Sequence, residues 1–451
     1  MSGIIHSWPI EIDFNRAQIR SRIRETDILD LKSVATYIVF KDGGKIYAKS
    51  GDTGQIVVSD TDLGKVLQSV VNMIPDHGSA TIYIKPGIYK MYTGVRADRN
   101  FSLIGDTRVW DWMGPYGGIE NPTAYPGVYI RLMADGIRYF DLGPEDPNDP
   151  SASANFAIVN IGASASDENM VNVQHQNSIF IYLRNRVRHS LFDRIFIVGV
   201  GTGIKHEKTL SGAAGLQDVY FYRISVEHPY SFAFDLMNGS YNIRLVDVYA
   251  GWNKTDTYII MIGNASAVYV DRLWILGGTY RGLNIGNCKK VIVRDVIIDS
   301  LKGTYGFALT KITNGVVDTV LLDYDGTNSP AYIFHLDNNS NLEIRNVYAK
   351  YKNNTIYLIG LMPRMRNVRL LNVNNNVEYR SENSDVATIP AGQTRVTVTH
   401  NLITTPSRIS VTPLGQPPGK LWVENITSTS FDIVTDTAPA SDLKVSWYAE
   451  V

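Results

Sequence analysis

The sequence predicts an all-β protein: a right-handed parallel β-helix with an N-terminal capping helix and a C-terminal β-sandwich. The main observation is a short strand pattern that recurs about every two dozen residues from about residue 190. The turns between these repeats are rich in Gly and Asn, which tolerate the left-handed backbone that the corners of a solenoid require. Helical periodicity is nearly absent from the 451 residues, which also favours an all-β chain.

The first 54 residues are predicted to be an attachment region that ends in a three-stranded meander. Apolar residues alternate around the turns at 42–44 and 50–54, as in a set of β-hairpins. Residues 10–31 interleave arginines with isoleucines, which fits either an amphipathic helix for a partner or an ordinary solvated helix face.

A helix is predicted next, at the start of a solenoid that spans residues 55–385. Its apolar residues recur at helical spacing and are Leu63, Val66, Leu67, Val70, Val71 and Ile74. Thr61 or Asp62 can cap its first turn, and Pro75 with Gly78 ends it. We expect this helix to cover the open end of the first coil.

The repeat itself consists of two mostly polar residues followed by an aliphatic anchor. The eight anchors lie 21 to 29 residues apart and are Ile195, Ile224, Val248, Leu273, Val296, Val320, Val347 and Val368. Leucine-rich repeats have a similar length, but the leucine consensus and fixed Asn offsets that they need are missing. One short strand per repeat, with its anchor pointing inward, therefore predicts a parallel β-helix.

The helix and first coil, "DLGKVLQSVVNMIPDHGSATIYIKPGIYKM", resemble the opening of the pectate-lyase-like β-helix superfamily, which includes phage and archaeal-virus tailspike proteins. The resemblance covers roughly residues 55–375 and implies the fold more than an activity. The Asn-Thr-Asp, Asp-Asp and Gly-His-Gly elements of polygalacturonases are not found, nor is the Trp-Ile-Asp-His element of pectate lyases. No active-site residue can therefore be carried over from the superfamily.

Residues 386–451 form a separate unit, with about five alternating strands and Pro-rich turns but no solenoid spacing. The segment resembles the small lectin-like, trimer-forming domains that end viral fibres; a plain cap on the solenoid is the alternative. The resemblance implies a homotrimer.

Composition narrows the classes of partner. A net charge of -1 without basic runs makes nucleic acid an unlikely ligand, and no apolar stretch is long enough to span a membrane. A signal peptide is not visible at the N-terminus. The single cysteine, Cys288, is expected to be a small buried residue. Scattered histidines and an acidic loop without calcium-site spacing give no metal site, and no cofactor is predicted.

Carboxylates supply the catalytic candidates. The polar pairs that open the repeats are expected to form a ladder of opposite charges on the outer face. Three residues after each anchor, Asp299 and Asp323 fall on consecutive coils. Two stacked carboxylates about 5 Å apart could act as acid and base in a retaining glycosidase. A solvated pair, or one bridged by Lys350 or a cation, is the simpler account, and Glu227 with His228 is a further candidate.

Aromatic residues next to Gly-rich or polar loops supply the carbohydrate-binding candidates, namely Trp110, Trp112, Tyr116 and Trp252. Flat rings on an exposed flank can stack on sugar faces, although core packing or contacts between subunits explain such residues equally well. The leading hypothesis is a viral or cell-surface spike that binds host-surface glycans and is attached to a virion or filament through its N-terminal region. The alternative is a polysaccharide-degrading hydrolase or lyase on the same scaffold.

Overall fold

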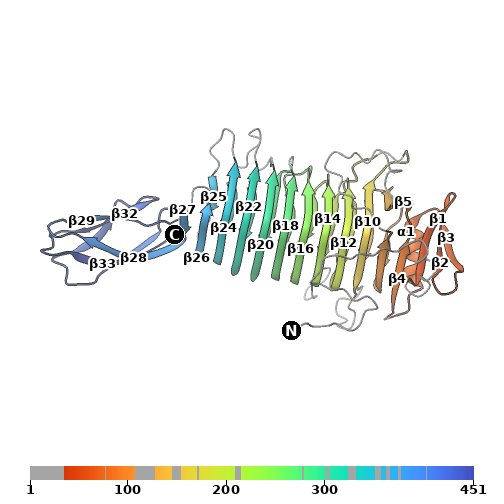
Figure 1. Cartoon of the computed structure of the whole chain (residues 1–451), viewed down its shortest axis with the longest axis horizontal. Coiled ribbons are helices and arrows are strands. Elements are labelled where there is room, and N and C mark those ends of the chain that lie inside the picture. Colours follow the sequence, from red (N-terminus) through yellow and green to blue (C-terminus); the bar gives the residue numbers. More distant parts are fainter. Residues whose placement is uncertain are drawn as a thin grey trace.

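The computed structural model describes residues 35–76, 78–106, 127–144, 154–169, 172–208, 215–276, 279–299, 301, 305–323, 332–350, 357–361, 366–373, 377–402 and 404–451. The molecule is elongated, and its strands lie side by side along the long axis (Figure 1). The segment at 10–31, with its predicted partner helix, lies outside the described residues.

The N-terminal end of the solenoid carries the predicted meander and the capping helix. The antiparallel strands are β1 (Tyr37–Asp42), β2 (Lys45–Ser50) and β3 (Ile56–Asp60), and β1 also pairs in parallel with β4 of the solenoid. Helix α1 (Leu63–Asn72) is capped by Asp62, which accepts a hydrogen bond from the Gly64 amide. The same carboxylate accepts from Thr93 at 2.8 Å, so the cap also fixes the helix to the first coil.

Two parallel sheets form the walls of the solenoid. In the 17-stranded sheet, β1–β3 are joined by β4 (Ser79–Ile84), β5 (Gly87–Met91), β7 (Asn100–Gly105), β8 (Val128–Leu132), β10 (Phe156–Ala165), β12 (Arg188–Val198), β14 (Gln217–Glu227), β16 (Ser240–Gly251), β18 (Ala265–Leu276), β20 (Lys290–Asp299), β22 (Asn314–Asp323), β24 (Ser340–Lys350), β26 (Arg366–Val373) and the antiparallel β27 (Val377–Arg380). The 10-stranded sheet contains β6 (Val95–Ala97), β9 (Arg138–Leu142), β11 (Ile179–Arg184), β13 (Thr202–Glu207), β15 (Phe232–Leu236), β17 (Tyr258–Gly263), β19 (Arg281–Gly286), β21 (Tyr305–Thr310), β23 (Tyr332–Asp337) and β25 (Tyr357–Leu361). Each full coil therefore has one long and one short strand, and the expectation of a single strand per repeat was wrong.

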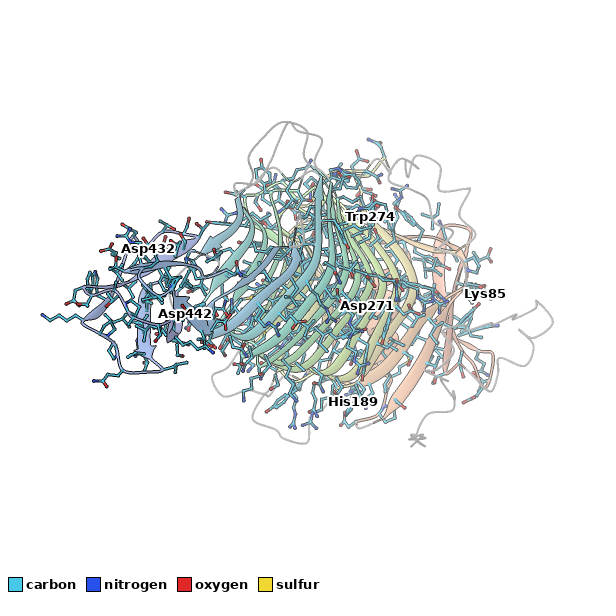
Figure 2. The ribbon with its side chains drawn as sticks, turned by 60° about the vertical axis from the view of Figure 1, so that its left-hand side comes forward. Lys85, His189, Asp271, Trp274, Asp432 and Asp442 are labelled. Carbon is cyan, nitrogen blue, oxygen red and sulfur yellow. The ribbon has the colours of Figure 1, made fainter. Side chains whose placement is uncertain are left out.

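Each long strand from β10 to β24 has a residue with a left-handed backbone at the same corner position. These corner residues have φ of 50–60° and are Asn160, Arg194, Arg223, Asp247, Arg272, Asp295, Thr319 and Asn346. They stand in register on successive coils and divide each long strand into a first arm before the corner and a second arm after it. Asp271 and Trp274 of β18, labelled in Figure 2, lie on the two sides of one such corner.

Seven of the eight predicted anchors form one buried column just after this corner, each at most 2% exposed. The eighth was wrong. Val368 pairs with Leu342 of the first arm of β24, and Val373 occupies the anchor column instead. The "RNV" motif of β26 copies the "RNV" of β24 but begins five residues earlier in the coil.

A single apolar core fills the solenoid from Val39 to Leu370 and includes the inner face of α1. Phenylalanines from neighbouring coils pack ring to ring inside it, for example Phe192 on Phe221 with centroids 5.3 Å apart. Cys288 is buried, as predicted, and burial raises the pKa of its thiol to about 11.

The C-terminal unit has two three-stranded antiparallel sheets with their own core. One contains β28 (Glu382–Ile389), β30 (Arg408–Pro413) and β33 (Leu443–Glu450); the other contains β29 (Arg395–Thr399), β31 (Leu421–Glu424) and β32 (Ser430–Thr435). This is one strand more than predicted, and the unit continues the long axis beyond the last coil (Figure 1). Among the described residues there is no helix with the length and apolar character needed to cross a bilayer.

Candidate functional site

The predicted charge ladder is present at the corner. Asp193 makes a two-pronged ion pair with Arg223 of the next coil, at 2.8 and 2.6 Å. Arg272 pairs in the same way with Asp247 of the preceding coil. These pairs neutralise charge on adjacent coils and assign most corner residues to structure rather than to a site.

The ladder does not extend to Arg366 and Asn367, which precede the predicted anchor Val368 and were therefore expected in it. The register places them on the first arm of β26 and not at the corner. Asn367 instead continues a ladder of side-chain amides on the first arm. Its Nδ2 donates to Asn341 Oδ1 at 3.0 Å, and Asn341 donates in turn to Asn314 at 3.1 Å.

The register brings Asp299 and Asp323 together as direct neighbours on β20 and β22. Asp299 is partly buried, and the side chain of Asp323 lies outside the described part of the chain. The next residue in this column is Lys350, also in register with Asp323. The consecutive-coil placement is thus confirmed, while the catalytic role of the pair remains a prediction.

Glu227 ends β14, and its carboxyl group has a strongly perturbed pKa. Burial raises its pKa to about 7, although a 3.4 Å hydrogen bond from Ser225 favours the ionised form. Glu227 and Asp299 share one column but are separated by the coils of Gly251 and Leu276. At ~4.8 Å per coil they lie too far apart to act on one bond.

His228 and Trp252 lie beside Glu227, where the second arm turns toward the 10-stranded sheet. Their rings stack, with centroids 4.9 Å apart and an angle of 11°. Burial, together with the charge of Lys254, lowers the pKa of His228, so the imidazole is neutral at pH 7. An acid with a raised pKa is therefore followed in the chain by a neutral imidazole that stacks on an indole. The other aromatic candidates, Trp110, Trp112 and Tyr116, lie outside the described residues.

A second group of perturbed carboxyls, which the sequence did not indicate, lies on the outward face of the 10-stranded sheet. Glu207 accepts a hydrogen bond from Tyr182 at 3.0 Å and forms an ion pair with Lys205 at 3.3 Å. Burial alone would raise the pKa of Glu207, but these two contacts outweigh it and the pKa is lowered. Asp235 is in register with Lys205 on the next coil; burial and the charge of Glu207 raise its pKa. The two acids are thus driven apart in pKa, the arrangement that acid–base chemistry requires.

Two tyrosine–arginine columns stand on outward faces of the solenoid. On the first arm, the Arg244 guanidinium lies 5.4 Å from the Tyr220 ring and 5.8 Å from the Tyr269 ring. On the 10-stranded sheet, the Arg281 guanidinium lies 5.6 and 6.0 Å from the rings of Tyr258 and Tyr305. In each column the three residues occupy consecutive coils, so cation and rings alternate along the fibre axis. The sequence did not reveal either column, because only the polar pair and the anchor of each repeat were aligned from coil to coil.

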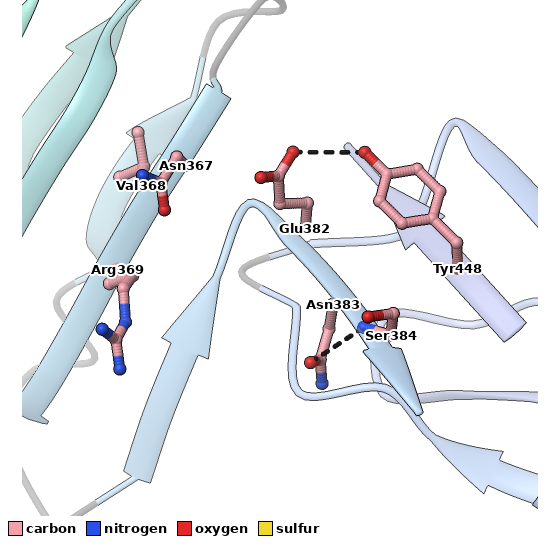
Figure 3. A pocket seen from close by; sticks show the side chains of 7 residues that line it. All are labelled: Asn367, Val368, Arg369, Glu382, Asn383, Ser384 and Tyr448. Carbon is pink, nitrogen blue, oxygen red and sulfur yellow. Dashed lines mark hydrogen bonds between the residues drawn. The ribbon is translucent and has the colours of Figure 1, made fainter. Parts of the chain in front are cut away.

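A polar pocket of about 360 Å³ lies between the last coil and the C-terminal unit (Figure 3). Asn367 and Arg369 of β26 line one side, and Glu382 and Tyr448 line the other. The Tyr448 hydroxyl lies 3.1 Å from the Glu382 carboxylate and 2.7 Å from that of Glu450, so its own neighbours satisfy it.

Groups of three or more His, Cys, Asp and Glu side chains that could hold a metal ion do not occur among the residues that the structure describes.

Comparison with known proteins assigns no family to this chain. No protein-family model and no curated protein matches the chain. Among solved structures, it is similar to tailspike protein gp49 of Acinetobacter baumannii bacteriophage Fri1, a capsular polysaccharide depolymerase, at 13% identity and a TM-score of 0.34, covering 86% of this chain and 82% of that one. It is also similar to the enzymatically active domain of tailspike protein 2 of bacteriophage CBA120, at 8% identity and a TM-score of 0.43, covering 80% and 61%.

A third similar structure is the A-module of the Azotobacter vinelandii mannuronan C-5 epimerase AlgE6, at 13% identity and a TM-score of 0.27, covering 68% and 94%. Identities and TM-scores this low carry no functional argument. The parallel β-helix is established by the strand register of this chain itself.

Proposed function

We propose that this protein is a viral or cell-surface spike that binds host-surface glycans along its solenoid. The observation that carries the proposal is the pair of outward tyrosine–arginine columns. Tyr220 and Tyr269 lie two coils apart, about 10 Å at ~4.8 Å per coil, and Tyr258 and Tyr305 repeat this spacing on the other sheet. A rigid row of flat rings is suited to the apolar faces of successive sugars in an extended chain.

The test is a glycan array probed with the full chain and with tyrosine variants. Replacing Tyr220 and Tyr269, or Tyr258 and Tyr305, by Ala should weaken binding about 10-fold or more, because each aromatic contact contributes roughly 0.5–1.5 kcal/mol beyond its buried area. The matching Phe variants keep the rings and should keep most of the affinity. A wild-type protein that binds no glycan, or Ala variants that bind as well as the wild type, would contradict the proposal.

We further propose a homotrimer attached to a larger particle through residues 1–54. Apolar side chains on the second arm provide contact area, since Leu321 and Tyr348 are 42% and 56% exposed on neighbouring coils. Light scattering at micromolar concentration should give three times the chain mass of 50.3 kDa. A monomer under these conditions would refute the assembly.

Polysaccharide cleavage is the second candidate, and the perturbed carboxyls favour it. Glu227 holds a proton near pH 7 and could protonate a leaving oxygen, while Glu207 and Asp235 form a second group with opposed pKa shifts. Incubating bound glycans with the protein and assaying new reducing ends or unsaturated products separates the two functions. Turnover supports the enzyme, and binding without products supports the spike.

A further inference from the structure

We propose that Arg244 binds the carboxylate of an acidic sugar, which makes the preferred ligand a carboxylate-bearing polysaccharide. The inference rests on the proposed glycan-binding function and deepens it, because it names the class of sugar. It follows from a comparison of the two tyrosine–arginine columns.

The column on the 10-stranded sheet is already neutralised. Arg281 donates to both oxygens of Asp256, at 2.8 and 3.0 Å, so its fork is occupied by a carboxylate of the same chain. Its guanidinium is therefore a structural cation that holds the rings of Tyr258 and Tyr305 in a row.

Arg244 has the same aromatic neighbours but, in the part of the chain that the structure describes, makes no ion pair with a carboxylate. The acidic side chains nearest in the register have partners of their own. Asp271, labelled in Figure 2, pairs with Arg272 at 3.0 Å, and Asp218 accepts a hydrogen bond from Asn242 at 2.5 Å. Arg244 is thus an exposed guanidinium held between two rings, and its side chain hydrogen-bonds the neutral Tyr222 hydroxyl but, among the described residues, no carboxylate.

The surroundings add recognition elements for a sugar. The Tyr222 ring stacks on Tyr220 with centroids 6.1 Å apart and an angle of 14°, which widens the aromatic surface on one side of Arg244. Burial raises the pKa of Tyr222, while the charge of Arg244 and the hydrogen bond from its guanidinium oppose the rise, so the phenol keeps its proton and can donate.

The chemistry of this group favours a carboxylate over a neutral sugar. A guanidinium presents parallel N–H donors that match the two oxygens of a carboxylate, and Lys presents only a point charge. The flanking rings offer faces on which the pyranose that bears the carboxylate can stack. A uronic acid or another sugar acid fits both requirements at once.

The experiment compares acidic oligosaccharides with their carboxyl-reduced forms, using the full-length protein on one array that also carries neutral and sulfated glycans. The wild type should prefer carboxylate-bearing sugars by ~10- to 100-fold, the range expected for a charge-assisted hydrogen bond of about 1.5–3 kcal/mol. Arg244→Gln should abolish this preference, and Arg244→Lys should keep only part of it. Circular dichroism and melting would confirm that the variants are folded.

Arg281→Gln is the matched control. It removes a cation from the equivalent column, so it should leave the ratio of acidic to carboxyl-reduced binding unchanged, whatever it does to overall affinity. Equal binding of acidic and reduced sugars, a preference for sulfated sugars alone, or an acidic preference that survives in Arg244→Gln would overturn the inference while leaving glycan binding intact. Absence of binding to every glycan would refute the proposed function itself.

Discussion

Replacing Glu227 by Gln should stabilise the protein in alkaline solution but not in acid. The carboxyl is desolvated at the end of β14, and its pKa rises from 4.5 to about 7. Gln keeps the shape of the side chain and can still accept the hydrogen bond from Ser225, but it never ionises. The variant therefore removes the cost of ionising a buried group and little else.

The pH dependence of this stability difference follows from proton linkage. Below about pH 4.5 the carboxyl is protonated in both the folded and the unfolded chain, and it has no pH-dependent effect on stability. Between pH 4.5 and 7 the unfolded chain ionises first, so the folded state loses relative stability, and above pH 7 the loss is complete. A shift of this size corresponds to about 3 kcal/mol at 1.36 kcal/mol per pKa unit.

The assay is thermal or urea unfolding of wild type and Glu227→Gln at pH 4, 6 and 8 and constant ionic strength. The stability difference should grow by up to about 3 kcal/mol from pH 4 to pH 8. If the whole chain unfolds cooperatively, an unfolding entropy of about 2.1 cal/mol/K per residue makes this a Tm change of about 3 °C.

Glu207→Gln supplies a control of opposite sign. Tyr182 and Lys205 lower the pKa of Glu207, so its ionised form stabilises the fold above its unfolded pKa, and this contribution is lost as the pH falls through the folded pKa. That variant should lose stability at pH 8 and approach wild type in acid. A pH-independent difference for Glu227→Gln would show that its carboxyl is solvated, and would remove the argument for it as an acid.

Other predictions concern the corner and the carboxylate pair. Asp193→Ala should lower the free energy of unfolding in urea by about 3 kcal/mol, because it removes a carboxylate that is only 3% exposed and leaves its arginines unpaired. Asp247→Ala should lower it by at most about 1 kcal/mol, because that carboxylate is 38% exposed. Equal losses would contradict the link between burial and the strength of these pairs. Thr319→Asn should raise stability by up to about 1 kcal/mol, because a β-branched residue is strained at φ 57°, and a lower Tm would refute the strain. If turnover is found, Asp299→Asn or Asp323→Asn should each reduce it at least ~100-fold at nearly constant Tm, and full turnover in both variants would assign the pair to structure.

The fold was predictable because each coil of a solenoid has a similar length, so inward-facing residues recur at a regular spacing in the sequence. Every coil must place an apolar anchor at the same point of the wall, so Ile195 and Val320 could be aligned without knowing anything else about the chain. The alignment failed at Val368, where sequence likeness between two strands was mistaken for equivalent position in the coil. Only the hydrogen-bonded register distinguishes the two.

The candidate site was less predictable for a related reason. Spacing identifies which residues are neighbours on successive coils, as it did for Asp299 and Asp323, but burial depends on the cross-section of the solenoid. The second strand of each coil carries no corner motif, so Glu207 and Asp235 left no periodic signal. The raised pKa of Glu227 comes from the packing around it, which no local pattern records.

The same stacking that builds the solenoid also decides which of its charges can act. Side chains on adjacent coils are ~4.8 Å apart, close enough for ion pairs, and the corner uses this distance to neutralise Asp193, Asp247 and their arginines. The chain has a net charge of -1, with 43 basic and 44 acidic residues, so most of its cations can be neutralised by its own carboxylates. Arg244 differs because its neighbours in the column are rings instead of carboxylates, so its charge is exposed without being neutralised. In such a scaffold an uncompensated cation is the feature that most needs an external partner, and an acidic sugar is the partner whose shape and charge fit that column.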